Sequence, residues 1–254
     1  MTTILAVANH KGGVGKTTTT FNLAGHYASQ GRRVLVCDLD PQASLTKLLG
    51  FNPATARPSL TELLLDRATP PEVAIHATQI DNVWLIPSNP DLAHAEKQLI
   101  GRIGREKVLA RFLRPLAAAF DVVLLDCPPA LDLLNTNGLT AAHEVFVPVE
   151  SSTLATQALP DFLRTIEDIR REANPDLRIA GFFITKHQPH TSHSRSVLAL
   201  LKEQFPDKVF EAHIPQSVVA KDSVAASIPA VTFNPRSSIA EAYRLLAEEI
   251  THHA

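Results

Sequence analysis

Residues 8–18 read Ala-Asn-His-Lys-Gly-Gly-Val-Gly-Lys-Thr-Thr. An apolar, strand-like run over 4–8 precedes them, and a helix-like stretch over 17–30 follows. A strand, a glycine-rich loop, a Lys-Thr pair and a helix, in that order, make the phosphate-binding loop known as a P-loop. Its glycines let the backbone curl until successive N–H groups point at one anion, and the helix N-terminus adds its dipole. The stretch therefore predicts a nucleotide-binding α/β protein.

The residues of this loop have distinct predicted roles. Lys16 can reach the β- and γ-phosphates of a nucleoside triphosphate, and the Thr17 hydroxyl can coordinate Mg²⁺. We therefore expect ATP and Mg²⁺ as cofactors. The predicted nucleotide-binding residues of the loop are Lys11, Gly12, Gly13, Val14, Gly15, Lys16, Thr17 and Thr18.

Composition is typical of an intracellular enzyme. The chain has 254 residues, 45% of them hydrophobic, which is enough for one sizeable core, so we expect a single domain over 1–254. The net charge of −2 gives no global basic field. No apolar run approaches the roughly 18–20 residues of a membrane span, and Met1 leads directly into a strand. We expect a cytoplasmic protein with no stable membrane association.

Strand-like and helix-like segments alternate along the chain. Apolar strands are predicted over 33–37, 83–87, 120–126, 144–149 and 177–185, with a short one over 208–210. Helices are predicted over 59–65, 92–100, 106–118, 131–142, 153–173, 194–204 and 237–250. Continuous apolar strands between helices indicate a sheet that is covered on both faces. The predicted fold is an α/β P-loop NTPase with a mostly parallel, twisted sheet.

Three aspartates follow predicted strands at the edge where open α/β sheets bind ligands. Asp38 and Asp40 alternate along an extended chain, so one can face the phosphates while the other is held in the protein. Asp126 ends an apolar strand, in the form of a Walker B carboxylate, and suits the shell of a Mg²⁺ ion. The predicted metal site comprises Thr17, Asp40 and Asp126.

The position of Lys11, near the start of the loop, goes beyond an ordinary P-loop. With it, the segment resembles the deviant Walker A loop of the ParA/MinD family. The resemblance extends over essentially the whole chain and is closest to the short, Soj-like partition ATPases. The matching segments are Lys11-Gly-Gly-Val-Gly-Lys-Thr-Thr, Asp38-Leu-Asp-Pro-Gln-Ala, Leu125-Asp-Cys-Pro-Pro-Ala, Asn137-Gly-Leu-Thr-Ala-Ala and Ile214-Pro-Gln-Ser-Val.

The resemblance implies a slow, partner-stimulated ATPase that acts in chromosome or plasmid partition. It implies that Lys11 reaches across a homodimer to the partner's nucleotide, that Asp40 positions the attacking water, and that Lys11, Lys16 and Asp40 are the catalytic residues. Pro215 and Ser217 match a loop that lies against adenine. ATP-bound dimers of such proteins hold DNA without sequence preference, on the nucleoid, until a ParB-like protein stimulates hydrolysis.

The chain departs from the family where relatives carry DNA-binding arginines. His190, Gln216 and Val219 occupy those positions here. Phosphate contact needs only charge within reach, so other residues of the region can substitute. The candidate DNA contacts are Lys186, His190, Arg195, Lys202, Lys208, Lys221 and Arg236.

Other functions stay open. A ParA-like ATPase that positions a protein cargo, such as a chemoreceptor array or a compartment, is not separable from partition by sequence. A MinD-like membrane ATPase is disfavoured, because the C-terminal helix carries three glutamates instead of a basic amphipathic face. A metabolic P-loop enzyme would need an acceptor pocket, for which there is no motif. An iron–sulfur cluster is disfavoured, because Cys127 adjoins the Walker B aspartate.

Overall fold

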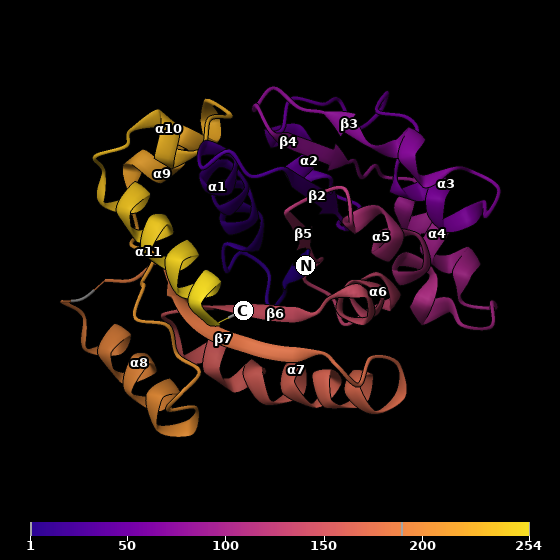
Figure 1. Ribbon diagram of the computed structural model, residues 1–254. Helices are drawn as coiled ribbons and strands as arrows, with labels where there is room; N and C mark the ends of the chain where they lie inside the picture. Colours follow the sequence, from indigo (N-terminus) through magenta and orange to yellow (C-terminus); the bar gives the residue numbers. More distant parts are fainter. Residues whose placement is uncertain (1, 189, 254) are drawn as a thin grey trace.

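A seven-stranded sheet runs through the molecule in the order β3-β4-β2-β5-β1-β6-β7 (Figure 1). The computed structural model describes residues 2–188 and 190–253, with all of their side chains except those of 153–158 and 252–253. The strands are β1 (Thr3–Val7), β2 (Val34–Asp38), β3 (His76–Ala77), β4 (Val83–Ile86), β5 (Val122–Asp126), β6 (Glu144–Glu150) and β7 (Arg178–Thr185). All neighbouring pairs are parallel except β3 with β4. The predicted mostly parallel sheet is confirmed.

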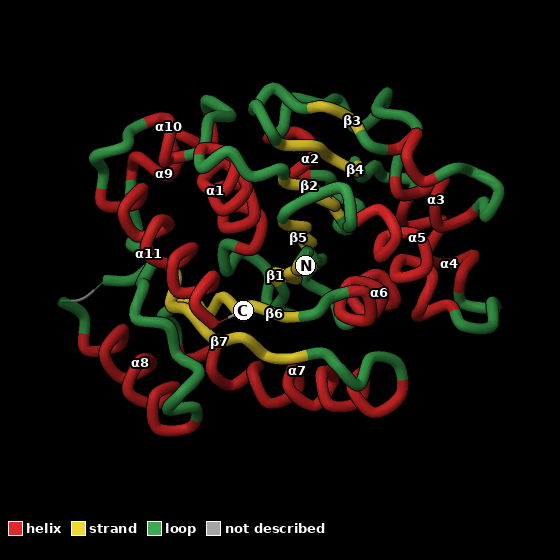
Figure 2. The backbone as a smooth tube through the Cα atoms, in the orientation of Figure 1, coloured by secondary structure: helices red, strands yellow, loops and turns green. Residues whose placement is uncertain are grey.

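Helices cover both faces of the sheet (Figure 2). One face carries α1 (Lys16–Ser29), α2 (Ser44–Leu48), α9 (Val218–Ala225), α10 (Ala230–Phe233) and α11 (Ser238–His253). The other carries α3 (Leu60–Leu65), α4 (Leu92–Leu99), α5 (Val108–Ala117), α6 (Leu133–Ala141), α7 (Thr153–Glu172) and α8 (Ser192–Gln204). Two short 3₁₀ helices, Pro71–Ala74 and Arg105–Lys107, lie in the connections of that second face.

The interiors of the central strands β1, β2 and β5 are apolar because each of these strands faces two cores. In β5, Val122 and Leu124 belong to the core beneath α1 and α11, whereas Val123 and Leu125 belong to the core beneath α4–α7. Successive side chains of a strand point to opposite faces, so a doubly covered strand has no position for a polar residue. This is why continuous apolar runs predicted the central strands.

The structure differs from the predicted elements in three ways. The segment 208–210 is not a strand, because it meets β7 at a single bridge between Phe182 and Val209. Here Phe210 turns inward and stacks on Phe146, with ring centroids 5.8 Å apart. The antiparallel β3 and the short helices α2, α9 and α10 were not predicted. Of the helices in the described part of the chain, none is both long and apolar enough to span a membrane.

Candidate active site

The three sequence segments of the predicted site meet at one edge of the sheet. The last residue of β5, Asp126, pairs in register with Val7 at the end of β1 and with Asp38 at the end of β2. The P-loop follows β1 directly, and Asp40 lies two residues beyond β2. The carboxyl ends of parallel strands thus bring the loop and the carboxylates together, as the sequence predicts.

The loop is fixed by its backbone conformation and by two side chains. Gly13 and Gly15 have φ angles of 73° and 90°, a region that favours glycine. Thr185, at the end of β7, donates its hydroxyl hydrogen bond to the Val14 carbonyl at 2.8 Å. Asn9 accepts a hydrogen bond from the Lys11 N–H at 3.0 Å. The loop is therefore tied to the strand before it and to a distant strand.

The Lys16 ammonium folds back over the loop. Its Nζ donates to the Lys11 carbonyl at 3.1 Å, and the residue is only 6% exposed. Burial lowers the pKa of Lys16, and the nearby Asp126, Cys127 and Asp40 oppose that shift. A buried cation held over a loop of convergent amides is arranged to receive phosphate.

The alternation of Asp38 and Asp40 predicts that one carboxylate faces the phosphates while the other is held in the protein. Asp38 is fully buried, and its carboxylate accepts hydrogen bonds from the Thr46 N–H at 2.9 Å and the Thr46 hydroxyl at 2.7 Å. Asp40 instead lines the hollow over the P-loop. Its Oδ1 accepts from the Gln42 N–H at 2.9 Å, and its carbonyl accepts from the Ser88 hydroxyl at 2.6 Å. Asp40 is therefore the carboxylate placed to meet a ligand.

Asp126 lies beneath the P-loop helix and is only 1% exposed. The Thr20 hydroxyl donates to its Oδ1 at 3.5 Å. Burial and the neighbouring Asp38 raise the pKa of Asp126. Its Oδ2 has no hydrogen-bond partner among the described residues. An unpartnered buried oxygen beside Thr17 fits a water molecule of a Mg²⁺ shell, so the predicted metal residues suit that ion.

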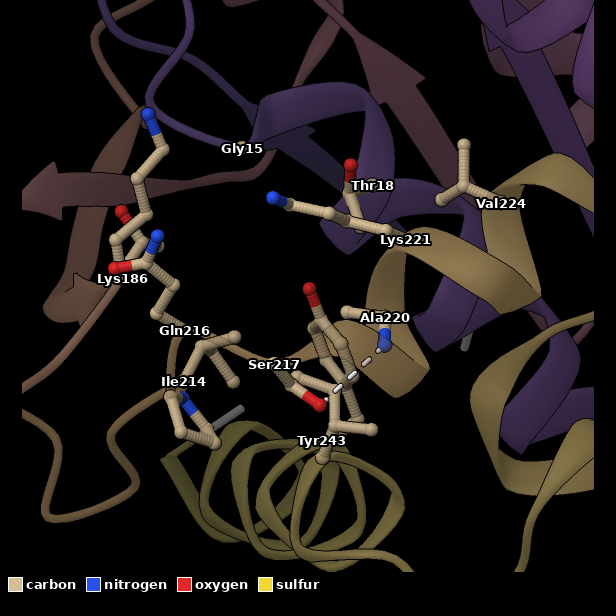
Figure 3. Close-up of a pocket in the computed structure, with 13 residues that line it drawn as sticks. Gly15, Thr18, Lys186, Ile214, Gln216, Ser217, Ala220, Lys221, Val224 and Tyr243 are labelled. Atoms are coloured by element: carbon tan, nitrogen blue, oxygen red, sulfur yellow. Dashed lines mark hydrogen bonds between the residues drawn. The ribbon is translucent and has the colours of Figure 1, made fainter.

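Two hollows adjoin above the P-loop. The larger, about 620 Å³, is lined by Gly12, Gly13, Gly15, Lys16, Thr17, Thr18, Asp40, Ser44, Lys47 and Pro129, among others. The smaller, about 260 Å³, is more enclosed by apolar atoms, and its walls include Thr185, Ile214, Pro215, Gln216, Ser217, Ala220, Lys221, Ile239 and Tyr243 (Figure 3). Gly15, Thr18, Lys186 and Val224 line both. The pair suits a nucleotide, with phosphates in the first hollow and the base in the second.

The loop that carries Pro215 and Ser217 is held in place at both ends. His187, just beyond β7, donates its N–H to the Ile214 carbonyl at 2.9 Å. Ser217 begins α9, and its hydroxyl accepts from the Ala220 N–H at 3.4 Å. Pro215 and Ser217 both line the apolar hollow, as expected for residues that contact a base.

Lys11 makes contacts within its own subunit. Its Nζ donates to Glu150 Oε2 at 2.8 Å and to the Ser152 hydroxyl at 2.9 Å. Lys186 binds the other oxygen of Glu150 at 3.0 Å. Burial raises the pKa of Glu150, but the hydrogen bonds from the two lysines outweigh it and bring the pKa below its usual value. One carboxylate at the end of β6 thus holds two cations beside the P-loop.

The candidate DNA contacts separate into two groups. Lys186 and Lys221 line the nucleotide hollows. The others are outside these hollows: Arg195 and Lys202 lie on α8, His190 precedes it, Lys208 follows it, and Arg236 precedes α11. Lys202 is paired with Glu211 at 2.5 Å. Of the seven candidate DNA contacts, two, Lys186 and Lys221, therefore line the nucleotide hollows, and the other five lie elsewhere.

Several lining residues were missed by sequence reasoning. Lys47 and Ser44 reach the phosphate hollow from α2, and Tyr243 reaches the base hollow from α11. For Lys47 and Ser44, the nearness of α2 to the Asp38-Leu-Asp-Pro-Gln-Ala segment was an available signal. For Tyr243, no local signal existed, since α11 lies far along the chain.

Comparisons with known proteins agree with this geometry. A family model described as an AAA domain matches residues 2–179. The sporulation initiation inhibitor protein Soj of Bacillus subtilis is 37% identical over 247 residues, covering 97% of each chain. The chromosome partitioning protein ParA of Myxococcus xanthus is 34% identical, covering 97% of this chain and 87% of its own. A structure described as cobyrinic acid a,c-diamide synthase from Mycobacterium smegmatis, with a bound ATP analog and magnesium, is 42% identical, has a TM-score of 0.89, and covers 100% of this chain and 95% of its own.

Proposed function

Because this chain belongs to the ParA/Soj-type family of P-loop ATPases, with an AAA domain over residues 2–179, we propose that it is an ATP-dependent switch for chromosome or plasmid partition. It binds ATP with Mg²⁺, dimerises, holds DNA without sequence preference, and is released when a ParB-like partner stimulates hydrolysis. The observation that carries the ATPase part is the gathering of Lys16, Thr17 and Asp40 around one hollow.

The chemistry needed for hydrolysis is modest. Phosphoryl transfer to water depends on positioning and on neutralising charge more than on covalent help. When bound, Mg²⁺ supplies charge at the β- and γ-phosphates. Lys16 and the loop amides would hold the phosphates, Thr17, Asp40 and Asp126 would hold the ion and its water, and Asp40 would also orient the attacking water. Because that constellation lacks a strong base, turnover is slow, which suits a timer.

Dimerisation and DNA binding form the switch. In the dimer, Lys11 reaches the partner's nucleotide, and the two subunits double a basic surface that is weak in one. The candidate surface comprises His190, Arg195, Lys202, Lys208 and Arg236, and most of it lies along α8 and its flanks (Figure 1). Between about 50 and 200 mM salt, affinity for random-sequence DNA should fall with a log–log slope of about −0.9 per phosphate contact.

The test combines light scattering with a DNA-retention assay. ATP should shift the wild type from monomer to dimer, ADP should not, and Lys11→Ala should block the shift. Only the ATP dimer should be retained on random-sequence DNA. Lys16→Ala, which removes the cation over the phosphates, should lose both responses while its circular dichroism spectrum stays native. Equal dimer fractions with ATP and ADP would refute the switch.

A second candidate is favoured by one observation. His190, Gln216 and Val219 stand where relatives carry DNA-binding arginines, and the first two are exposed. A ParA-like ATPase that positions a protein cargo does not need those arginines. An ATP-dependent dimer that is not retained on DNA at low salt would select this second function.

A further inference from the structure

The side chain of Lys221 extends from α9 into the apolar hollow, with its ammonium directed toward the P-loop (Figure 3). Lys221 is exposed, and the sequence placed it among DNA contacts. Its actual neighbours in the wall of the hollow include Gly15 and Thr18, the end of the phosphate-binding loop. The side chain therefore faces the hollow beside the P-loop.

The charge of Lys221 is not neutralised by the protein. In the chain over residues 2–188 and 190–253, no ion pair involves Lys221, whereas Lys186 across the hollow is paired with Glu150 at 3.0 Å. An exposed cation that lines the hollow and has no counter-ion can pair with an anion that enters with the ligand.

The place of α9 indicates which part of the nucleotide that anion is. Val224 lies one turn after Lys221, on the same face of α9, and lines both hollows together with Gly15 and Thr18. Since Lys16, Thr17 and Asp40 mark the end that takes the β- and γ-phosphates, and Pro215 marks the base, the shared walls lie near the α-phosphate.

We propose that Lys221 contacts the α-phosphate of the nucleotide bound in its own subunit, and so couples α9 to nucleotide binding. The inference rests on the proposed nucleotide site. It makes Lys221 a binding residue common to ATP and ADP, in contrast to residues that distinguish the two by the γ-phosphate. No covalent step is involved.

The test measures nucleotide affinity in the absence of DNA. Binding of ADP and of the ATP analogue AMPPNP, each with Mg²⁺, is followed by calorimetry for the wild type, Lys221→Gln and Lys221→Arg. A solvated charge-assisted contact predicts that Lys221→Gln weakens both nucleotides by a similar factor, about fivefold, and that Lys221→Arg restores most of it. Lys97→Gln, at an exposed lysine of α4 outside the hollows and outside the candidate DNA surface, is the matched control and should bind like the wild type.

Other outcomes separate the possibilities. Unchanged affinity in Lys221→Gln, with normal binding by the wild type, would overturn this inference and leave the nucleotide site standing. Weakening of AMPPNP alone would place the ammonium at the γ-phosphate and would also overturn it. Failure of the wild type to bind either nucleotide would overturn the proposed function itself. At saturating ATP, the ATPase rate of Lys221→Gln should match the wild type while KM rises, because a contact to the α-phosphate is the same in the ground and transition states.

Discussion

One oxygen of the Asp40 carboxylate accepts a hydrogen bond from the chain, and the residue lines the hollow over the P-loop. Oδ1 accepts the Gln42 N–H, and the backbone is fixed through Ser88. The residue is therefore held in position without being needed to bind phosphate. Asp40→Ala should bind ATP with nearly wild-type affinity but hydrolyse it at least about a hundredfold more slowly, the usual scale for losing a positioned acid–base group.

Single-turnover kinetics with a parallel nucleotide-binding assay would separate these two effects. Ser44→Ala, which alters the same hollow without removing a carboxylate, is the control. Wild-type turnover in Asp40→Ala would move the water-positioning role to another group.

Among the individual site residues, the sequence predicted those that belong to contiguous motifs. Lys16, Thr17 and Asp126 were identified because local spacing fixes their place on a strand–loop–helix unit. Lys221 was assigned to DNA, and its place in the wall of the apolar hollow was not predicted, because the path of α9 back over Thr18 depends on contacts between residues some two hundred positions apart. Asn22 of α1 accepts the Ala230 N–H at 2.7 Å, and no local pattern encodes that contact.

Helices α1 and α10 meet at Gly25, where there is no room for a side chain. A Cβ there would lie 2.5 Å from the Cβ and Cγ atoms of Pro229, whose ring cannot move without its backbone. Gly25→Ala should therefore destabilise the fold by about 1–3 kcal/mol, despite the better helix propensity of alanine. Because Pro229 connects to α9, nucleotide affinity should fall as well.

Thermal or urea unfolding measures the first effect, and nucleotide titration measures the second. Gly101→Ala is the matched control, because a Cβ at Gly101 meets nothing within 4 Å. Equal stability of the two variants would show that Pro229 adjusts more freely than its packing suggests.

Two histidines beneath the base loop, His187 and His213, should make the stability of the fold depend on pH. The rings of His187 and His213 are 4.7 Å apart, and His187 Nδ1 lies 2.8 Å from the Ser194 hydroxyl. Burial lowers the pKa of His213, His187 and Lys202 lower it further, and Glu211 opposes them. The folded pKa is below the ordinary value of about 6.5, so at lower pH the unfolded chain binds more protons than the folded one.

Stability from this site is therefore complete above about pH 6.5 and is lost as pH falls below it. In His213→Phe, which keeps a ring but cannot titrate, the free energy of unfolding should fall less between pH 7.5 and 5.5 than in the wild type. Denaturant titrations across that range measure the slope, with His94→Gln, an exposed histidine, as control. An identical slope in His213→Phe would exclude a titrating role for this side chain.

The length of a helix explains whether the sequence predicted it. The segments around α5 and α7 were found because long amphipathic periodicity survives any local irregularity. By contrast, α9 and α10 have eight and four residues, and they begin at Ser217 and after Pro229, where tertiary contacts fix them. Such short helices resemble loops in sequence, because their stability comes mostly from packing.

For the whole molecule, the alternation of apolar strands and helices was sufficient to predict the layered architecture. The order of the strands was not predictable from it, nor was the antiparallel β3, which pairs with β4 through two residue pairs only. The joined hollows were also not predictable, because the walls of the apolar hollow come from β7, α9 and α11 as well as from the P-loop. Those segments share no local motif.

The contact between Lys11 and Glu150 within one subunit has a consequence for the proposed dimer. In the proposed dimer, a lysine that neutralises its own Glu150 is not available to the partner's nucleotide, so the carboxylate would be an intramolecular competitor of that nucleotide. Such a competitor acts at a high effective concentration regardless of how dilute the protein is. The pair is partly exposed, with 25% and 23% of the two side chains accessible, so its strength is about 1 kcal/mol or less.

Two such pairs must open in the proposed dimer, one per subunit. Glu150→Gln should therefore lower the protein concentration at which ATP produces half-maximal dimer, by up to about thirtyfold, as followed by analytical ultracentrifugation. Arg33→Gln, which breaks the exposed pair with Asp121 away from the site, is the control. A raised threshold in Glu150→Gln would mean that the carboxylate guides Lys11 instead of retaining it. With retention, the Glu150 side chain at the end of β6 would raise the protein concentration at which the proposed dimer assembles.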